Sequence, residues 1–292
     1  MNKQSKAQVF ILLGQSNAVG HDLPMAEEDK IVIPMKNVFG LTREKNQSYD
    51  INELTWSGYT SAEMNLGETQ DDTYSLANCL ATLWQKQIEQ GEKLPNLYIV
   101  QIAIGGEGVT EKYMWYPKKS QMLQPGKLFE ANISLYSFSR HILSLLKKSF
   151  EKQNQDYEIL GLHWRGGEEE INVPMEALEN SLKGIYEELF EGLWGSLKDR
   201  PATILHKIVL EERANNDTTH NIQARMDYIN QVFAWLEERH GNVTIFDPCK
   251  SPFYTLDAQG RGLFKQDLTH FTRENNEWIA RTIIEEYKKN NQ

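Results

Sequence analysis

The residues of this chain that are best placed to do chemistry are a serine near one end and a histidine near the other. Ser16 follows the apolar run 9–13 and Gly14, a pattern typical of a buried strand that ends in a tight turn. His270 stands three residues after Asp267, just before a long amphipathic segment. A serine hydroxyl becomes a nucleophile when an imidazole accepts its proton and a carboxylate holds that imidazole in the correct tautomer. The three residue types therefore predict acyl transfer if the fold brings them together.

Each of these pieces also has a simpler interpretation. A loop serine commonly caps a helix, and Asn17 then only holds the turn or orients Ser16. An Asp-x-x-His sequence arises often by chance, and its two side chains can serve helix capping and local charge balance. Taken singly, neither the serine nor the Asp-x-x-His sequence decides between catalysis and capping.

The elements that must position these residues alternate along the chain. Short apolar runs predict strands over 8–13, 37–41, 97–104, 159–164, 203–209 and 243–246. Amphipathic stretches predict helices over about 73–90, 130–152, 174–198, 220–240 and 273–289, with Thr272 placed as a helix N-cap. Strands separated by single helices predict an α/β protein with a mostly parallel sheet and helices on both faces. No repeat, linker or composition break divides the chain, so we expect a single domain over 1–292.

Two long segments, 42–72 and 105–129, are expected to be irregular and to follow strands directly. They would lie at the carboxyl edge of the sheet, where open α/β sheets bind ligands. Their aromatic side chains could stack on a sugar ring, pack the loops onto the sheet or form a subunit contact, and the sequence leaves these roles open for Trp56, Tyr59, Tyr113, Trp115 and Tyr116.

Composition excludes several classes of function. The net charge of −10 over 292 residues argues against a nucleic-acid partner, because phosphate binding needs a cationic surface. No stretch approaches the roughly 20 apolar residues of a membrane span, and the N-terminus lacks a signal-peptide core, so we expect a cytoplasmic protein without a membrane partner. The two cysteines have no metal-ligand spacing, and His163 and Glu168 lack a third ligand nearby, so no metal or cofactor is expected. The sequence leaves open whether the chain forms a homo-oligomer.

Four short motifs occur in an order typical of one family of hydrolases. They are Gly14-Gln15-Ser16-Asn17, Gly105-Gly106, Trp164-x-x-Gly167-Glu168 and Asp267-x-x-His270. In these motifs the chain resembles the SGNH-type hydrolases of the acetylxylan esterase and sialate O-acetylesterase group, carbohydrate esterase family six and its relatives. The resemblance runs from residue 8 to about 287. It implies a three-layer flavodoxin-like fold with five or six strands, and ester hydrolysis without a metal.

The resemblance also assigns roles. It implies that Ser16 is the nucleophile, His270 the base and Asp267 the carboxylate that orients the base. It implies an oxyanion hole formed by the N–H of Ser16, a second backbone N–H, for which Gly67 is the candidate, and a side-chain amide. It suggests that Glu168 ties the loop after its strand to the nucleophile loop. The oxyanion and substrate candidates are Gln15, Asn17, Gly67, Gly106, Arg165, Glu168 and Trp115.

One position departs from the family pattern. The family usually reads Trp-x-Gln-Gly-Glu, whereas this chain has Gly166 in place of the glutamine. If the glutamine amide donates to the oxyanion, its loss costs about 10²–10³ in rate. Three explanations are open: a water fills the gap, Arg165 or another side chain substitutes, or the chain is a weak esterase.

These observations predict a serine esterase that removes O-acetyl groups from a small acetylated carbohydrate. One alternative is a carbohydrate-binding or regulatory protein that kept the fold with weakened catalysis. Another is a sialate O-acetylesterase or a general short-chain esterase.

Overall fold

A seven-stranded sheet forms the centre of the computed structural model, which describes residues 6–21, 25–69, 73–118, 134–210, 221–253 and 269–291. The strand order is β3-β2-β4-β1-β5-β6-β7. In chain order the strands are β1 Ala7–Gly14, β2 Val38–Leu41, β3 Trp56–Gly58, β4 Leu97–Ala103, β5 Tyr157–Arg165, β6 Thr203–His206 and β7 Val243–Phe246.

The sheet is parallel except for β3, which runs antiparallel to β2. The predicted α/β class with a mostly parallel sheet is therefore confirmed, but the expected five or six strands were too few. The strand that was missed has only three residues, Trp56–Gly58, in the segment 42–72 that was expected to be irregular. It forms by pairing with β2, and so short a strand carries too little alternation to be recognised.

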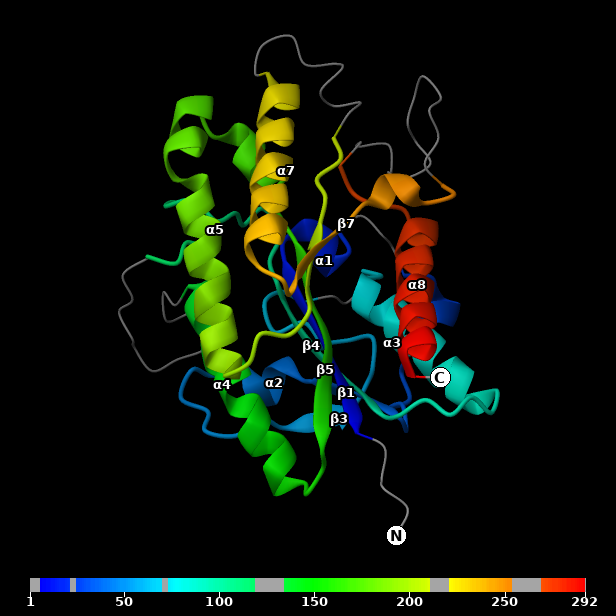
Figure 1. The fold of residues 1–292 in the computed structure, drawn as a ribbon. Helices are drawn as coiled ribbons and strands as arrows, with labels where there is room; N and C mark the ends of the chain where they lie inside the picture. Colours follow the sequence, from blue (N-terminus) through cyan, green and yellow to red (C-terminus); the bar gives the residue numbers. More distant parts are fainter. Residues whose placement is uncertain are drawn as a thin grey trace.

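Helices cover both faces of the sheet (Figure 1). Among the described residues the long helices are α3 Leu76–Glu89, α4 Leu135–Lys152, α5 Met175–Leu197, α7 Ile222–Arg239 and α8 Arg273–Asn291. The shorter ones are α1 Ser16–Val19, α2 Arg43–Asn46 and the 3-10 turns Glu27–Asp29, Glu169–Asn172 and Pro248–Lys250. The long helices that the sequence predicts all appear, with bounds close to those expected.

The central strand β1 shows how the layers form. Its side chains alternate, so that Phe10 and Leu12 pack into the core beneath α3 and α8. Val9, Ile11 and Leu13 face the other way, into the larger core beneath α4, α5 and α7. Because both faces are covered, every residue of β1 is buried.

The position of β1 in the sheet also determines where a ligand would bind. From β1 the chain first builds β2 and β4 on one side, and then crosses to build β5, β6 and β7 on the other. The carboxyl end of β1 is therefore the point where the winding changes direction. Open α/β sheets bind ligands in the crevice at this point, and Ser16 follows β1 directly.

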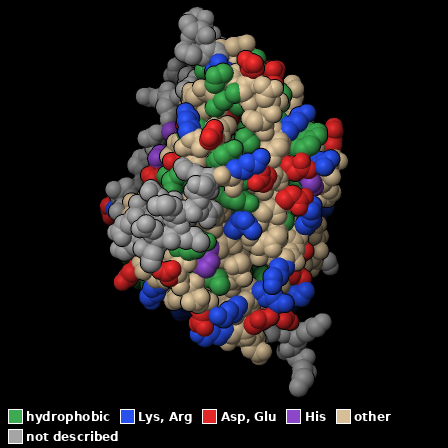
Figure 2. All heavy atoms as spheres, turned by 90° about the vertical axis from the view of Figure 1, so that its left-hand side faces the viewer, with side chains coloured by type: hydrophobic (Ala, Val, Ile, Leu, Met, Phe, Trp, Pro, Cys, Tyr) green, Lys and Arg blue, Asp and Glu red, His purple; other side chains and the backbone are tan. Residues whose placement is uncertain are grey.

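Acidic and basic side chains are interspersed on the face that Figure 2 presents, which is the left-hand side of Figure 1. Oppositely charged side chains also pair between elements, as in Arg239 with Glu187 and Lys118 with Glu188. No described helix has the length and apolar character needed to cross a bilayer. Neither of the two cysteines, Cys79 and Cys249, forms a disulfide.

Candidate active site

Ser16 is the first residue of α1 and lies at the exit of β1. Gly14 makes this exit at a φ of +141°, and a Cβ there would lie 2.0 Å from the carbonyl oxygen of Arg165. The Gln15 N–H then donates to the same oxygen at 2.9 Å. Glycine is therefore required for β1 to turn so closely against β5. As the first residue of a helix, Ser16 has an N–H without an acceptor inside that helix, which suits an oxyanion donor.

Asn17 joins the serine turn to the segment that carries His270. Its Nδ2 donates to the carbonyl oxygen of Thr269 at 3.1 Å, and its Oδ1 accepts from the N–H of Phe271 at 3.1 Å. The two bonds bracket His270. The fold therefore brings Ser16 and His270 from opposite ends of the chain to one edge of the sheet, as acyl transfer requires.

Glu168 fixes the serine turn from the side of β5. Its Oε1 accepts from Asn17 Nδ2 at 2.7 Å, and its Oε2 accepts from the side-chain amide of Gln15. All three side chains are buried. The suggested tie between the loop after β5 and the nucleophile loop is therefore present, and the amides of Gln15 and Asn17 form it.

A second histidine lies beside His270. His21 comes directly after the turn that ends α1, and its N–H donates to the carbonyl oxygen of Ser16 at 3.1 Å. The rings of His21 and His270 have centroids 5.9 Å apart and planes inclined by 51°. Asp267, the predicted partner of His270, lies outside the described residues.

The predicted second oxyanion donor, Gly67, is held against β4. Its N–H donates to Asn65 Oδ1 at 3.1 Å, and a Cβ at this position would lie 2.2 Å from the carbonyl oxygen of Ala103. The N–H that the family resemblance offers to the substrate thus already has an acceptor in this structure. Gly106 is different: it is exposed and has a φ of +71°, so glycine is needed there for the backbone turn.

Arg165 is buried, with 1% of its surface exposed, and its side chain points toward α8. Its Nη1 donates to Asn276 Oδ1 at 2.8 Å, and its guanidinium lies 4.7 Å from the ring centroid of Phe271. Burial lowers the pKa of Arg165 to about 10, and the nearby Glu168 carboxylate opposes that shift. These contacts support the segment after His270, whereas Arg165 Nε and Nη2 are buried and have no hydrogen-bond partner among the described residues. The substitute oxyanion role of Arg165 stays a prediction.

The indole of Trp164 fills the space beside Gly166. A Cβ at Gly166 would lie 3.1 Å from this ring, and the Trp164 N–H donates to the carbonyl oxygen of Gly166 at 3.0 Å. The indole is itself buried in the core of the α4–α5 face. A side chain at position 166 would therefore need the tryptophan to shift by a few tenths of an ångström.

The aromatic residues of the long loops serve packing in two clear cases. Trp115 and Tyr59 are both fully buried. The indole N–H of Trp115 donates to the carbonyl oxygen of Gly14 at 3.0 Å, and its ring meets Trp164 edge-on at 5.0 Å. Trp115 therefore holds the loop after β4 against the end of β1. Because its ring is fully buried, it is not available to stack on a sugar.

Sequence reasoning missed a buried carboxyl that holds the same loop. Glu170 accepts from the N–H of Val109 at 2.7 Å, while its second oxygen has no partner. Burial raises the pKa of Glu170 to about 7, although the bond from Val109 opposes the shift. Three glutamates stand in a row at 168–170, and nothing in the sequence indicates which of their side chains is buried.

The two histidines of the sheet interior form a separate pair. His163 Nδ1 and His206 Nε2 lie 3.1 Å apart, and burial lowers the pKa of His163 to about 3. Within the described ranges, no three His, Cys, Asp or Glu side chains gather in a way that could hold a metal ion.

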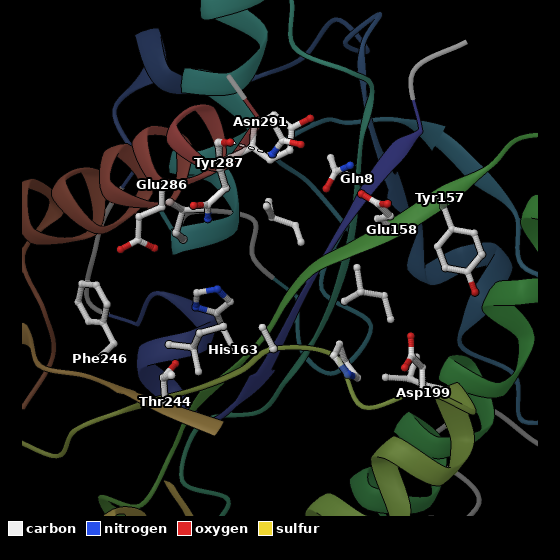
Figure 3. Close-up of a pocket in the computed structure, with 18 of the residues that line it drawn as sticks. Gln8, Tyr157, Glu158, His163, Asp199, Thr244, Phe246, Glu286, Tyr287 and Asn291 are labelled. Atoms are coloured by element: carbon white, nitrogen blue, oxygen red, sulfur yellow. Dashed lines mark hydrogen bonds between the residues drawn. The ribbon is translucent and has the colours of Figure 1, made fainter. Parts of the chain in front are cut away.

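A cavity of about 730 Å³ lies elsewhere, against the sheet and beside the end of α8 (Figure 3). Its wall includes Gln8, Glu158 and Tyr287, with His163 further along the sheet. Gln8 is the second residue of β1, whereas Ser16 follows the last one, so the two are about 25 Å apart at the rise of an extended strand. This cavity therefore lies far from Ser16.

No protein-family model matches the chain, and no curated protein matches it either. Solved structures do. The crystal structure of NanS has a TM-score of 0.63 at 16% identity, and the match covers 99% of this chain and 100% of that one. A protein from Arabidopsis thaliana gives 0.57 at 17% identity, with 98% and 99% covered. A family two carbohydrate esterase from Clostridium thermocellum in complex with cellohexaose gives 0.45 at 11% identity, with 99% and 65% covered.

The match to NanS extends over 99% of this chain, and so over the part of the chain that builds the seven-stranded sheet. The chain therefore shares the α/β fold of NanS.

Proposed function

We propose that this protein is a serine esterase that removes O-acetyl groups from a small carbohydrate. The observation that carries the proposal is the pair of bonds from Asn17 to Thr269 and Phe271, at 3.1 Å each. They hold His270, the histidine of the Asp-x-x-His motif, next to the turn that carries Ser16. A serine that merely capped a helix would need no such connection to the other end of the chain.

The mechanism uses Ser16 and His270 in two half-reactions. His270 accepts the proton as the Ser16 oxygen forms a bond to the acetyl carbonyl carbon, and the resulting oxyanion is met by the N–H of Ser16. Collapse of this intermediate breaks the ester bond, and His270 returns the proton to the departing sugar oxygen. Water then loses a proton to His270 as its oxygen bonds to the acetyl carbon, and collapse of this second intermediate breaks the bond to the Ser16 oxygen. The serine oxygen takes the proton back from His270, and the acetyl group leaves as acetic acid, which ionises to acetate. Asp267 is the proposed partner that orients His270.

The direct test is hydrolysis of p-nitrophenyl acetate by the purified chain and by Ser16→Ala. We expect the substitution to abolish turnover, because it removes the nucleophile. Ser144→Ala is a matched control, since Ser144 is an exposed serine on α4 whose hydroxyl donates to the carbonyl oxygen of His141 at 2.7 Å. Full activity of Ser16→Ala would overturn the assignment of the nucleophile.

Gly166 motivates a second candidate, a carbohydrate-binding protein with weakened catalysis. A serine-directed phosphonate distinguishes the two functions, because it forms a covalent adduct only with an activated serine. Mass spectrometry should find the adduct on Ser16. Its absence, together with measurable binding of acetylated sugars, would favour the binding protein.

A series of acyl chain lengths separates the acetylesterase from a general esterase. We expect kcat/KM to fall steeply beyond propionyl for an acetylesterase. A rate that holds or rises up to octanoyl would assign the chain to lipid-like esters instead.

A further inference from the structure

His21 and Glu68 form an ordered imidazole–carboxylate pair beside the proposed catalytic histidine. His21 Nε2 lies 2.9 Å from Glu68 Oε1, and Glu68 Oε2 accepts from the N–H of Gly105 at 2.8 Å. Both carboxylate oxygens therefore have a donor. Burial alone would raise the pKa of Glu68, but the bonds from His21 and Gly105 outweigh it and lower this pKa. Glu68 is thus an anion that fixes the proton of His21 on Nε2.

The backbone fixes the position of the imidazole. The His21 N–H donates to the carbonyl oxygen of Ser16 at 3.1 Å, so the residue is tied to the serine turn. The ring lies over Gly105, where a Cβ would come within 2.3 Å of His21 Cε1. Only a glycine at 105 leaves room for the ring in this place.

The pair is accessible, unlike most of the side chains around it. The side chains of His21 and Glu68 are each 33% exposed, whereas Ser16 is 9% exposed and Gln15 is 1% exposed. A substrate that reaches Ser16 can therefore also meet the ring of His21.

The distance between the rings of His21 and His270 indicates which part of the substrate would meet His21. In the proposed reaction His270 gives its proton to the oxygen of the departing alcohol. The ring of His21 lies beside the ring of His270, and the two ring centroids are 5.9 Å apart. Two rings at this separation can each bond to one of two oxygens that are themselves about 3 Å apart, given hydrogen bonds of ordinary length. Oxygens on adjacent carbons of a sugar ring meet this condition.

We propose that the His21–Glu68 pair binds the hydroxyl on the carbon next to the ester, and so selects acetyl esters of vicinal diols over those of simple alcohols. This inference rests on the proposed esterase function and adds a specificity-determining pair to it. A hydroxyl that donates a hydrogen bond suits an imidazole whose own proton is directed to the Glu68 carboxylate.

The test compares two substrates that differ by one methyl group: trans-1,2-cyclohexanediol monoacetate and its 2-methoxy analogue. The methyl ether cannot donate a hydrogen bond and is bulkier at the oxygen that His21 would meet. We expect the wild-type kcat/KM to favour the free hydroxyl by roughly tenfold, the value of one hydrogen bond of about 1.4 kcal/mol.

Two substitutions should remove this preference by different routes. His21→Leu deletes the bonding group, and Gly105→Ala keeps His21 but forces its ring away. Both should bring the ratio of the two kcat/KM values close to one. His141→Leu is the matched control, because His141 is a half-buried histidine on α4 that bonds to the carbonyl oxygen of Ile51 at 2.9 Å. It should keep the wild-type ratio.

The outcomes separate this inference from the proposed function. An active wild type whose ratio survives in His21→Leu would overturn the inference and leave the esterase intact. A wild-type ratio of one would do the same. A wild type that hydrolyses neither substrate nor p-nitrophenyl acetate would overturn both.

Discussion

The side-chain oxygen of Asn17 accepts a hydrogen bond from the backbone N–H of Phe271, 254 residues further along the chain, at 3.1 Å. With the bond to Thr269 it makes Asn17 the direct link between the serine turn and the histidine segment. Because Asn17 also donates to Glu168 at 2.7 Å, one amide connects the ends of β1 and β5 and the entry to α8. The position of the proposed base relative to the proposed nucleophile thus depends on Asn17.

Asn17→Ala should uncouple these segments. It removes the hydrogen bonds of Asn17 to the Thr269 carbonyl, the Phe271 N–H and one Glu168 oxygen, and each lost bond costs about 0.5–1.5 kcal/mol. We expect the free energy of unfolding in urea to fall by about 2–4 kcal/mol and kcat/KM to fall at least about 100-fold. Asn180→Ala, at an exposed position of α5, should leave both values unchanged. Wild-type turnover in Asn17→Ala would show that the link is dispensable.

Arg165→Lys should weaken the support of the segment that carries His270. A lysine loses the planar group that stacks on Phe271 at 4.7 Å and cannot keep the geometry of the bond to Asn276. We expect kcat to fall about tenfold as the support of the His270 segment loosens, with KM little changed.

Arg200→Lys is the matched control for Arg165→Lys, because Arg200 also combines a ring contact, 4.9 Å from Trp194, with a carboxylate bond to Glu191. It lies at the surface, where such pairs contribute little. Equal losses in the two variants would mean that Arg165 has no special relation to the site.

Sequence could predict the parts of this protein whose signal is local. The run 9–13 predicted β1, and helical periodicity predicted α7 and α8, because burial on one face requires it. The prediction that Ser16 and His270 lie close together rested on the chemistry of the two side chains and on the family resemblance. The pair of His21 with Glu68 had no such signal, because the two residues meet only when α1 and the segment before α3 close against β4.

Burial was the harder property to predict. Trp115 could have faced a sugar or the sheet, since an aromatic residue in a loop suits both, and its bond to Gly14 decides for the sheet. The inward direction of Arg165 depends on the register of β5 against β1, in which Arg165 lies opposite Gly14. A slip of one residue would have pointed that side chain to the other face.

Glu170 should make stability depend on pH. Its pKa is about 7 in the fold, against an ordinary value of 4.5 that applies when the chain unfolds. Between these values the folded chain holds a proton that the unfolded chain has lost. Its contribution to stability is therefore fully present below about pH 4.5 and is lost as the pH rises to 7.

Glu170→Gln should remove that dependence, because an amide does not ionise. Its oxygen can still accept from Val109. Relative to wild type, we expect the variant to gain on the order of 3 kcal/mol of unfolding free energy between pH 4.5 and 8. Glu176→Gln, at an exposed position of α5, should show no such gain. Parallel stability curves for wild type and Glu170→Gln would contradict the buried, protonated state.

Gly166→Gln tests whether this position limits catalysis. The family that the chain resembles has a glutamine here, and an added oxyanion donor is worth about 10²–10³ in rate. The backbone of Gly166 is not in the left-handed region, so a side chain is conformationally allowed. Its cost is the contact of 3.1 Å with the ring of Trp164, which must move slightly. We expect kcat for p-nitrophenyl acetate to rise by at least about tenfold.

Gly166→Ala separates the amide from the steric effect. It brings the same Cβ against Trp164 but supplies no donor, so its kcat should equal or fall below that of wild type. A gain in the glutamine variant alone would mean that the wild-type oxyanion hole lacks this donor. Equal rates in both variants would instead mean that another group, such as an ordered water, already serves the oxyanion, because a donor added to a complete site brings no further stabilisation of the transition state.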